Sequence, residues 1–225
     1  MQREREKQLA AEACVALVEP GMVLGLGTGS TAAYAVRKLG ERVRQGLRVR
    51  GLPTSEATRR LAEAEGIPLV TFADVTALDL TLDGADEFDP QLNLIKGGGG
   101  ALFREKIVAA ASRRLVIFAD GSKRVPQLGR FPLPVEVNPF GWQAAAARIE
   151  ALGPRVTLRG GAERPFVTDN HGYVLDCAFG TIADPAGLEQ RLRAITGVMV
   201  TGLFVGMAEA VIIASGERVE TLRRA

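Results

Sequence analysis

Short apolar segments alternate with amphipathic ones through the first 120 residues of the chain. The apolar segments are predicted to be strands, and they lie at 22–26, 48–52, 67–72, 78–82 and 114–119. The segments between them are predicted to be helices, at 3–18, 31–43, 55–65 and 101–112. Strands that are apolar on both faces and separated by helices are typical of a mostly parallel sheet covered on both sides. The chain is therefore predicted to be an α/β protein.

The pattern changes near Phe131, where a strand–helix–strand–strand–helix–strand order begins. This order is typical of a ferredoxin-like α+β unit. Asp184 and Pro185 have the N-cap and N1 residue types that start its second helix. The apolar segment 207–215 is predicted to return to the first sheet. We therefore expect a large domain made of 1–130 plus 206–225 and a smaller one made of 131–205.

Composition excludes several classes of function. A net charge of +2 and 5% aromatic residues favour neither a polyanion-binding surface nor a base-stacking platform, so no nucleic-acid partner is predicted. The apolar stretches are too short or too interrupted to span a membrane, and the N-terminal residues mix both charge signs, unlike a signal peptide. We therefore expect a cytoplasmic protein without membrane association.

Cysteine and histidine are too sparse for a metal centre. Cys14 and Cys177 are interpreted as small core residues, and His171, the single histidine, as a surface residue in a turn. A zinc site or a Cys–His pair would need a cluster of such residues. No metal is predicted.

Four unusual loops follow predicted strands or, for GGGG, the short extended segment NLIK (93–96). Parallel strands bring such loops to the same edge of a sheet, where ligands bind. The loops are GTGST (27–31), DGAD (83–86), GGGG (97–100) and ADGSK (119–123). They hold many of the 26 glycines, a number above the usual share for this length. Because glycine lets backbone approach another group closely, this edge is the predicted functional site.

The GLGTGST segment follows a strand and opens a helix, an arrangement that presents backbone N–H groups to an anion. Thr28, Ser30 and Thr31 add hydroxyl donors. A dinucleotide fingerprint is disfavoured, because Ser30 replaces the third glycine and no acidic residue follows the second strand. Binding of a single phosphate is favoured, and a tight turn without a ligand is the alternative.

The DGADEFD segment concentrates four carboxylates, Asp83, Asp86, Glu87 and Asp89. They could chelate a divalent cation, transfer protons or cap the following turn. In KGGGGALFREK, Lys96 and Glu105 could supply a charge stabiliser and a base, although Glu105 alone would fit a solvated helix face. Lys123 ends ADGSK, and ordinary surface is its alternative.

The motifs GLGTGSTA, LDGADEFD, IKGGGGAL-x-REK and ADGSK, in this order and together with FPLPVEV, resemble ribose-5-phosphate isomerase of the A type over essentially the whole chain. The resemblance implies a Rossmann-like catalytic domain (1–130 plus 206–225) and a small lid or dimerisation domain (131–205). It also implies a homodimer or a dimer of dimers that needs neither cofactor nor metal. The implied reaction interconverts D-ribose 5-phosphate and D-ribulose 5-phosphate in the pentose phosphate pathway.

The same resemblance assigns residues by motif. Substrate contacts are implied at Lys7, Thr28, Gly29, Ser30, Thr31, Gly84, Ala85, Gly97, Gly98, Gly99 and Lys123. Catalytic roles are implied for Glu105, Asp83, Asp86 and Lys96. Gly100 is often alanine in relatives, and we expect this difference to be harmless.

The chemistry of isomerisation agrees with these residue types. A proton moves from C2 to C1 through an enediol(ate), and one carboxylate can serve both adjacent carbons, a role suited to Glu105. Asp83, with Asp86 in support, is favoured for moving the hydroxyl protons and helping to open the sugar ring. Lys96 and the glycine N–H groups can stabilise the developing oxyanion.

Two alternatives remain at this stage. One is a related enzyme on a similar scaffold, such as a sugar-phosphate deaminase/isomerase or a CoA transferase. The other is a non-catalytic sugar-phosphate sensor of the kind attached to transcription regulators. The sensor is disfavoured because Glu105 is intact and no DNA-binding helix pair is apparent.

Overall fold

The computed structural model describes residues 2–224, which form two compact units. The first unit contains the residues up to Ala85, Arg104–Lys123 and the residues from Met207, and the second contains Asp86–Phe103 and Arg124–Gly206. The sequence assigns 86–103 and 124–130 to the large domain, whereas contacts group them with the second unit. Strand pairing gives the reason, because 87–88 and 94–95 join a small sheet with 203–204.

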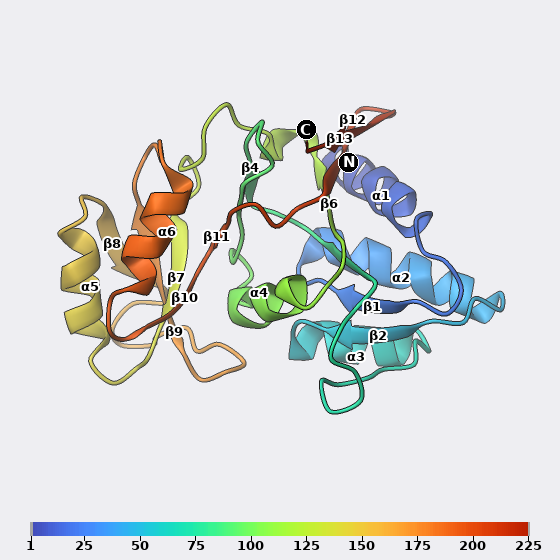
Figure 1. Ribbon diagram of the computed structural model, residues 1–225, viewed down its shortest axis with the longest axis horizontal. Helices are drawn as coiled ribbons and strands as arrows, with labels where there is room; N and C mark the ends of the chain where they lie inside the picture. Colours follow the sequence, from blue (N-terminus) through green and yellow to red (C-terminus); the bar gives the residue numbers. More distant parts are fainter. Residues whose placement is uncertain (1, 225) are drawn as a thin grey trace. The chain divides into compact units, whose positions relative to one another are not determined.

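The first unit is built on a six-stranded sheet in the order β13-β12-β6-β3-β1-β2 (Figure 1). Its strands are β1 (Val23–Leu26), β2 (Arg50–Pro53), β3 (Leu80–Asp83), β6 (Leu115–Asp120), β12 (Ala210–Ser215) and β13 (Arg218–Arg223). All neighbours pair in parallel except β12 and β13, which form an antiparallel hairpin. The predicted parallel sheet and the return of 207–215 to it are confirmed.

Helices cover both faces of this sheet. They are α1 (Gln2–Val15), α2 (Ser30–Arg44), α3 (Glu56–Ala64) and α4 (Leu102–Ala110). Side chains alternate along β1, so that Leu24 and Leu26 join the core beneath α1, α2 and α3. Val23 packs on the opposite face with Val108 of α4. The α/β fold class predicted from the sequence is therefore confirmed.

Two parts of the first unit differ from the sequence prediction. The segment 67–72 is not a strand, because it makes a single bridge, from Leu69 to Gly51. Pro68 has no N–H to donate, and Thr71 turns the chain by donating its N–H to Asp74 Oδ2 at 2.8 Å. Strand β13 was not predicted, since its charged sequence lies at an exposed sheet edge.

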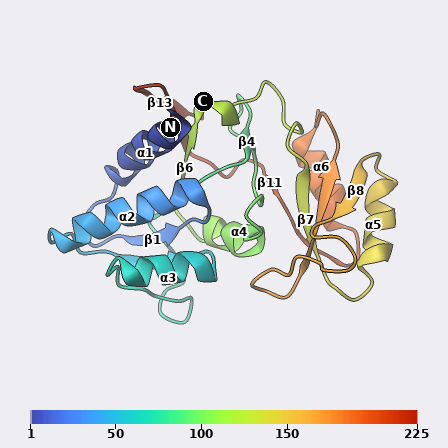
Figure 2. The same ribbon diagram turned by 180° about the vertical axis from the view of Figure 1, so that it is seen from behind.

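The second unit contains a four-stranded antiparallel sheet in the order β10-β7-β9-β8 (Figure 2). The strands are β7 (Leu133–Val137), β8 (Arg155–Leu158), β9 (Tyr173–Ala178) and β10 (Val198–Thr201), and the helices are α5 (Trp142–Glu150) and α6 (Pro185–Arg193). Side chains of both helices join the same core on one face of the sheet. Asp184 caps α6 by accepting the Gly187 N–H at 2.9 Å. This is the ferredoxin-like order that the sequence predicts.

A three-stranded sheet completes the second unit, in the order β11-β5-β4. Its strands are β11 (Leu203–Phe204), β5 (Leu94–Ile95) and β4 (Glu87–Phe88). The Glu87 carboxylate accepts the backbone N–H groups of Gly129 and Phe131 at 2.9 and 2.7 Å. Asp89 accepts two N–H groups of its own turn, so both carboxylates have structural roles.

Cys14 and Cys177 are buried, as predicted, and His171 is exposed in a turn. Among residues 2–224, no helix has the length and apolar character needed to cross a membrane. Within the same residues, no group of three or more His, Cys, Asp or Glu side chains is placed to hold a metal ion.

Candidate active site

The loop between β1 and α2 is shaped by its neighbour β3. A Cβ on Gly27 would lie 2.7 Å from the Asp83 Cα, and a Cβ on Gly25 would collide with the Thr81 side chain. Both residues must therefore be glycine to let β3 pack against β1. This part of the glycine excess results from packing between strands and not from approach to a ligand.

The N-terminus of α2 is suited to an anion. Its N-cap, Gly29, has a φ of 109°, and no side chain of residues 2–224 caps the helix. The first-turn N–H groups and the helix dipole therefore present positive charge. Lys7 Nζ lies 3.3 Å from Ser30 Oγ, which brings an ammonium to the same helix end.

The orientation of Lys7 is supported by a carboxylate. Its Nζ lies 2.7 Å from Glu4 Oε1, and the Tyr34 hydroxyl donates to Glu4 Oε2 at 2.8 Å. These two hydrogen bonds lower the pKa of Glu4 below its usual value. Lys7 and Ser30, two predicted substrate contacts, are thus brought together.

Thr28 faces a different environment from Ser30. Its Oγ1 lies within 2.8 Å of Thr54 Oγ1 and Ser55 Oγ and 3.2 Å from Thr58 Oγ1, and its N–H donates to Asp83 at 3.2 Å. The Thr28 hydroxyl therefore ties the loop to the start of α3. Sequence reasoning missed this hydroxyl cluster, because it identified Ser55 only as a helix cap.

Asp83 ends β3 and is 1% exposed. Its Oδ1 accepts the N–H groups of Thr28 and Gly84, the latter at 2.8 Å. Gly84 and Ala85 follow it and are half-buried. Lys123, also half-buried, lies in the short helix η1 (Gly121–Lys123) that follows β6, the strand beside β3. Neighbouring carboxyl ends thus carry Asp83 and Lys123, as the sequence predicts.

Glu105 lies in the first turn of α4 and is 4% exposed. Burial excludes the alternative of a solvated helix face. Moving a carboxylate out of water is costly, so a buried carboxylate is a candidate for chemistry.

In the second unit, the segment from Lys96 to Gly99 follows β5. Lys96 is 3% exposed, and its Nζ lies 5.5 Å from the centroid of the Phe204 ring. Gly98 donates its N–H to Asp86 Oδ2 at 2.7 Å, so this segment and Asp86 are brought together. Gly98 and Gly99 are exposed. Arg159 also contacts this segment, through the carbonyls of Gly97 and Gly98, and no motif marks it in the sequence.

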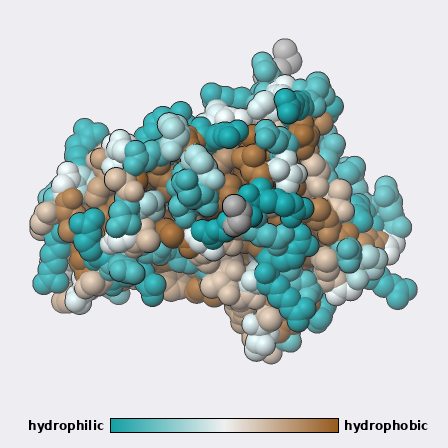
Figure 3. Space-filling model, turned by 45° about the horizontal axis from the view of Figure 1, so that its top comes forward, coloured by the Kyte–Doolittle hydropathy of each residue, from teal (hydrophilic) through white to brown (hydrophobic). Residues whose placement is uncertain are grey.

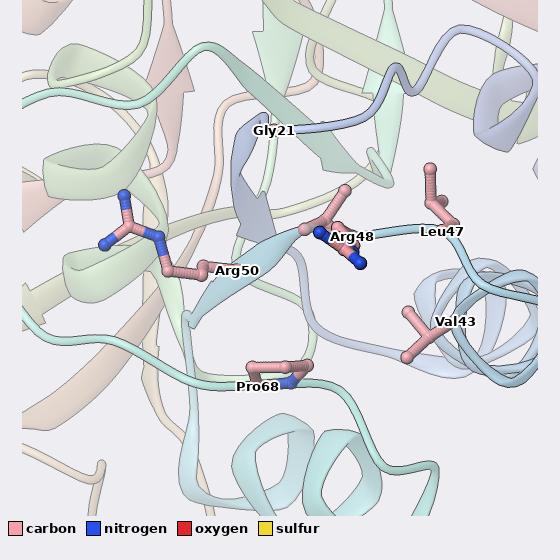
Figure 4. Close-up of a pocket in the computed structure, with 7 residues that line it drawn as sticks. Gly21, Val43, Leu47, Arg48, Arg50 and Pro68 are labelled. Carbon is pink, nitrogen blue, oxygen red and sulfur yellow. The ribbon is translucent and has the colours of Figure 1, made fainter.

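A pocket of about 400 Å³ lies elsewhere in the first unit, at the amino-terminal ends of β1 and β2 (Figure 4). It is lined by Gly21, Val43, Leu47, Arg48, Val49, Arg50 and Pro68. None of these is a predicted site residue, and the predicted site lies at the opposite ends of the strands. On the face drawn in Figure 3, hydrophilic side chains are mixed with smaller hydrophobic areas.

Comparisons with known proteins agree with the motifs. A family model described as ribose 5-phosphate isomerase A (phosphoriboisomerase A) matches residues 50–218. The chain is 61% identical to ribose-5-phosphate isomerase A of Gloeobacter violaceus over 218 residues, which cover 96% of this chain and 95% of that relative. It is 55% identical to ribose-5-phosphate isomerase A of Methylorubrum extorquens, with 94% and 92% of the two chains covered.

Solved structures agree as well. A D-ribose-5-phosphate isomerase in complex with phospho-erythronic acid matches over the whole of both chains, with a TM-score of 0.96 and 38% identity. Ribose 5-phosphate isomerase A of Methanocaldococcus jannaschii matches over 96% of this chain and 97% of that chain, with a TM-score of 0.91 and 39% identity.

Proposed function

Because the chain belongs to the ribose 5-phosphate isomerase A family, we propose that its two sets of loop residues carry out the aldose–ketose isomerisation of this family. The chain interconverts D-ribose 5-phosphate and D-ribulose 5-phosphate. The structural observation that supports this function best is Lys7 beside the open N-terminus of α2, since this arrangement fits the phosphate of such a substrate.

A coupled assay for ribulose 5-phosphate formation by the purified chain tests the function. We expect turnover with ribose 5-phosphate, and no turnover would contradict the proposal. An amino-sugar phosphate and CoA are tested in parallel. Turnover of the first or binding of the second would favour a related enzyme on a similar scaffold.

The proton transfer is assigned to Glu105. Isomerisation moves a proton between C2 and C1 through an enediol(ate), and a single base can reach both carbons because they are adjacent. The burial of Glu105 supports this role, since carboxylates are seldom buried unless they have a structural or chemical task.

Transfer of the hydroxyl protons is assigned to Asp83, with Asp86 in support. Two N–H groups fix Asp83 Oδ1 at the end of β3, so the orientation of this carboxyl is set by the loop that binds the substrate. Asp86 is half-buried and bonded to Gly98, which favours a role in holding the glycine segment as well.

Stabilisation of the developing oxyanion is assigned to Lys96 and the N–H groups of Gly97 and Gly99, because the Gly98 N–H donates to Asp86. A buried ammonium stabilises a nearby negative charge more strongly than an exposed one, because water screens it less.

Binding of the phosphate is assigned to Lys7, Gly29, Ser30 and Thr31. A further substrate contact is assigned to Lys123. Binding of a phosphate remote from the reacting carbons supplies energy that can orient the sugar. Thr28 contributes to this site through the loop that it holds, and Gly84 and Ala85 through the turn after Asp83.

The proposal includes two further features, a homodimer and a cytoplasmic location. Phe140 is 94% exposed, and a subunit interface would cover a side chain of this kind. Light scattering of the purified chain should give twice the mass of 23.9 kDa. A monomer at micromolar concentration would contradict the dimer.

A further inference from the structure

Arg159, which follows β8, makes a two-pronged ion pair with Asp176 of β9. Its Nε donates to Asp176 Oδ2 at 3.0 Å, and its Nη2 donates to Asp176 Oδ1 at 2.6 Å. The guanidinium is planar, so two parallel bonds to one carboxylate fix the direction of the third nitrogen, Nη1. The side chains of Arg159 and Asp176 are 18% and 26% exposed, which shields the pair from water in part.

The third nitrogen binds the glycine segment. Arg159 Nη1 donates to the carbonyl oxygens of Gly97 and Gly98 at 3.0 and 3.2 Å. These two carbonyls belong to the peptide groups that also contain the N–H groups of Gly98 and Gly99. In a planar trans peptide the C=O and the N–H point in opposite directions. By holding the two oxygens, Arg159 therefore directs both N–H groups away from itself.

Two further contacts stabilise this arrangement. Asp86 accepts the Gly98 N–H at 2.7 Å, on the side of the peptide away from Arg159. The Phe166 ring lies beneath Arg159, with 5.7 Å from the guanidinium carbon to the ring centroid, and it packs against Gly100. A segment of four glycines has high conformational freedom, so its direction must be set by such contacts.

We propose that Arg159 is a positioning residue for the isomerisation. It holds the carbonyls of Gly97 and Gly98 so that the Gly98 amide meets Asp86 and the Gly99 amide is directed away from Arg159, toward the proposed substrate. Asp176 supports Arg159 by fixing the plane of its guanidinium. The inference rests on the proposed role of residues 96–99 in binding the substrate.

The test compares the steady-state kinetics of Arg159→Ala with those of the wild-type chain, using ribose 5-phosphate. We expect kcat to fall by about 10²-fold, because small displacements in an active site cost about that much, and KM to change far less. Arg159→Lys should retain more activity, since an ammonium can reach the carbonyls but cannot form the two-pronged pair. Millimolar guanidinium chloride should restore part of the kcat of Arg159→Ala, which a purely structural role would not predict.

Arg155→Ala is the matched control, because Arg155 is an exposed arginine of β8, the strand that Arg159 follows. It should leave kcat unchanged. A wild-type kcat in folded Arg159→Ala would overturn the inference, as would an equal loss in Arg155→Ala. If Arg159→Ala does not fold, the same kinetics are measured with Arg159→Lys and Asp176→Asn. A wild-type kcat in both of these variants would overturn the inference. An inactive wild-type chain would contradict the proposed function instead.

Discussion

The two glycine-rich loops differ in what requires glycine. In the first unit, Gly25 and Gly27 make room for side chains of β3, and the segment then opens into the uncapped end of α2. In the second unit, Gly97 and Gly98 are held at their carbonyls by Arg159, and Gly98 is held at its N–H by Asp86. The first loop is positioned by strand packing and the second by side-chain hydrogen bonds.

The difference has a consequence for function. A helix end fixed by packing offers a rigid site for a fixed group such as a phosphate. A glycine segment whose carbonyls are held by a guanidinium keeps its N–H groups oriented in advance, which suits groups whose charge changes during the reaction. Substitutions in the first loop should therefore act mainly on stability and binding, and those around the second mainly on turnover.

The largest expected effect is that of Gly27→Ala. The added Cβ would meet the backbone of Asp83 at 2.7 Å, so β1 and β3 would have to separate. We expect the free energy of unfolding to fall by about 3 kcal/mol. Urea unfolding measures this loss. Gly84→Ala is the control, because its nearest neighbours lie 3.9 and 4.0 Å away, and equal stability of both variants would contradict the packing argument.

Lys7→Ala should weaken binding and largely spare the chemical step. A hydrogen bond to a charged group is worth about 2 kcal/mol, which corresponds to a rise in KM of about ten- to a hundredfold. Steady-state kinetics with ribose 5-phosphate measure the effect, with Lys38→Ala, an exposed lysine paired with Glu41, as the control. A fall in kcat at unchanged KM would speak against a binding role.

Gly100→Ala is expected to destabilise the second unit, contrary to the sequence expectation that alanine is harmless at this position. Gly100 has a φ of 78°, which costs alanine about 1–2 kcal/mol, and its Cβ would collide with the Phe166 ring. Removing that ring should relieve part of the cost. Thermal unfolding of Gly100→Ala, Phe166→Ala and the double variant tests this, and strictly additive losses would refute the predicted contact.

The smallest expected effect concerns the reactivity of the two thiols, Cys14 in the first unit and Cys177 in the second. Burial raises the pKa of Cys177 to about 12 and also raises that of Cys14. A raised pKa means less thiolate at pH 8, so neither thiol of the folded chain should react readily with a disulfide reagent. Both should react in urea, where the pKa values return to normal. Rapid reaction without denaturant would show that the unit containing that cysteine opens.

Sequence patterns predicted most of the fold because alternating apolar segments and helix caps are local signals. Ser55 and Asp184 cap α3 and α6 as expected. The prediction of a strand at 67–72 was wrong, because Pro68 and the Thr71–Asp74 turn outweigh the apolar character of the segment. Among the candidate site residues, the burial of Glu105 and the roles of Thr28 and Arg159 depend on contacts between distant segments. Gly97 and Arg159 are 62 residues apart, and no local pattern reports such a contact.

The central claim is that Glu105 moves the proton between C2 and C1. The direct measurement is loss of the C2 hydrogen of ribose 5-phosphate to solvent, followed by NMR in D₂O with Glu105→Gln. The amide preserves the shape of the side chain but cannot accept the proton, so exchange and turnover should both fall by about 10²–10⁴-fold. Glu63→Gln, at an exposed position of α3, should exchange at the wild-type rate. Exchange at C2 that persists at the wild-type rate in Glu105→Gln would contradict the assignment of Glu105 as the base.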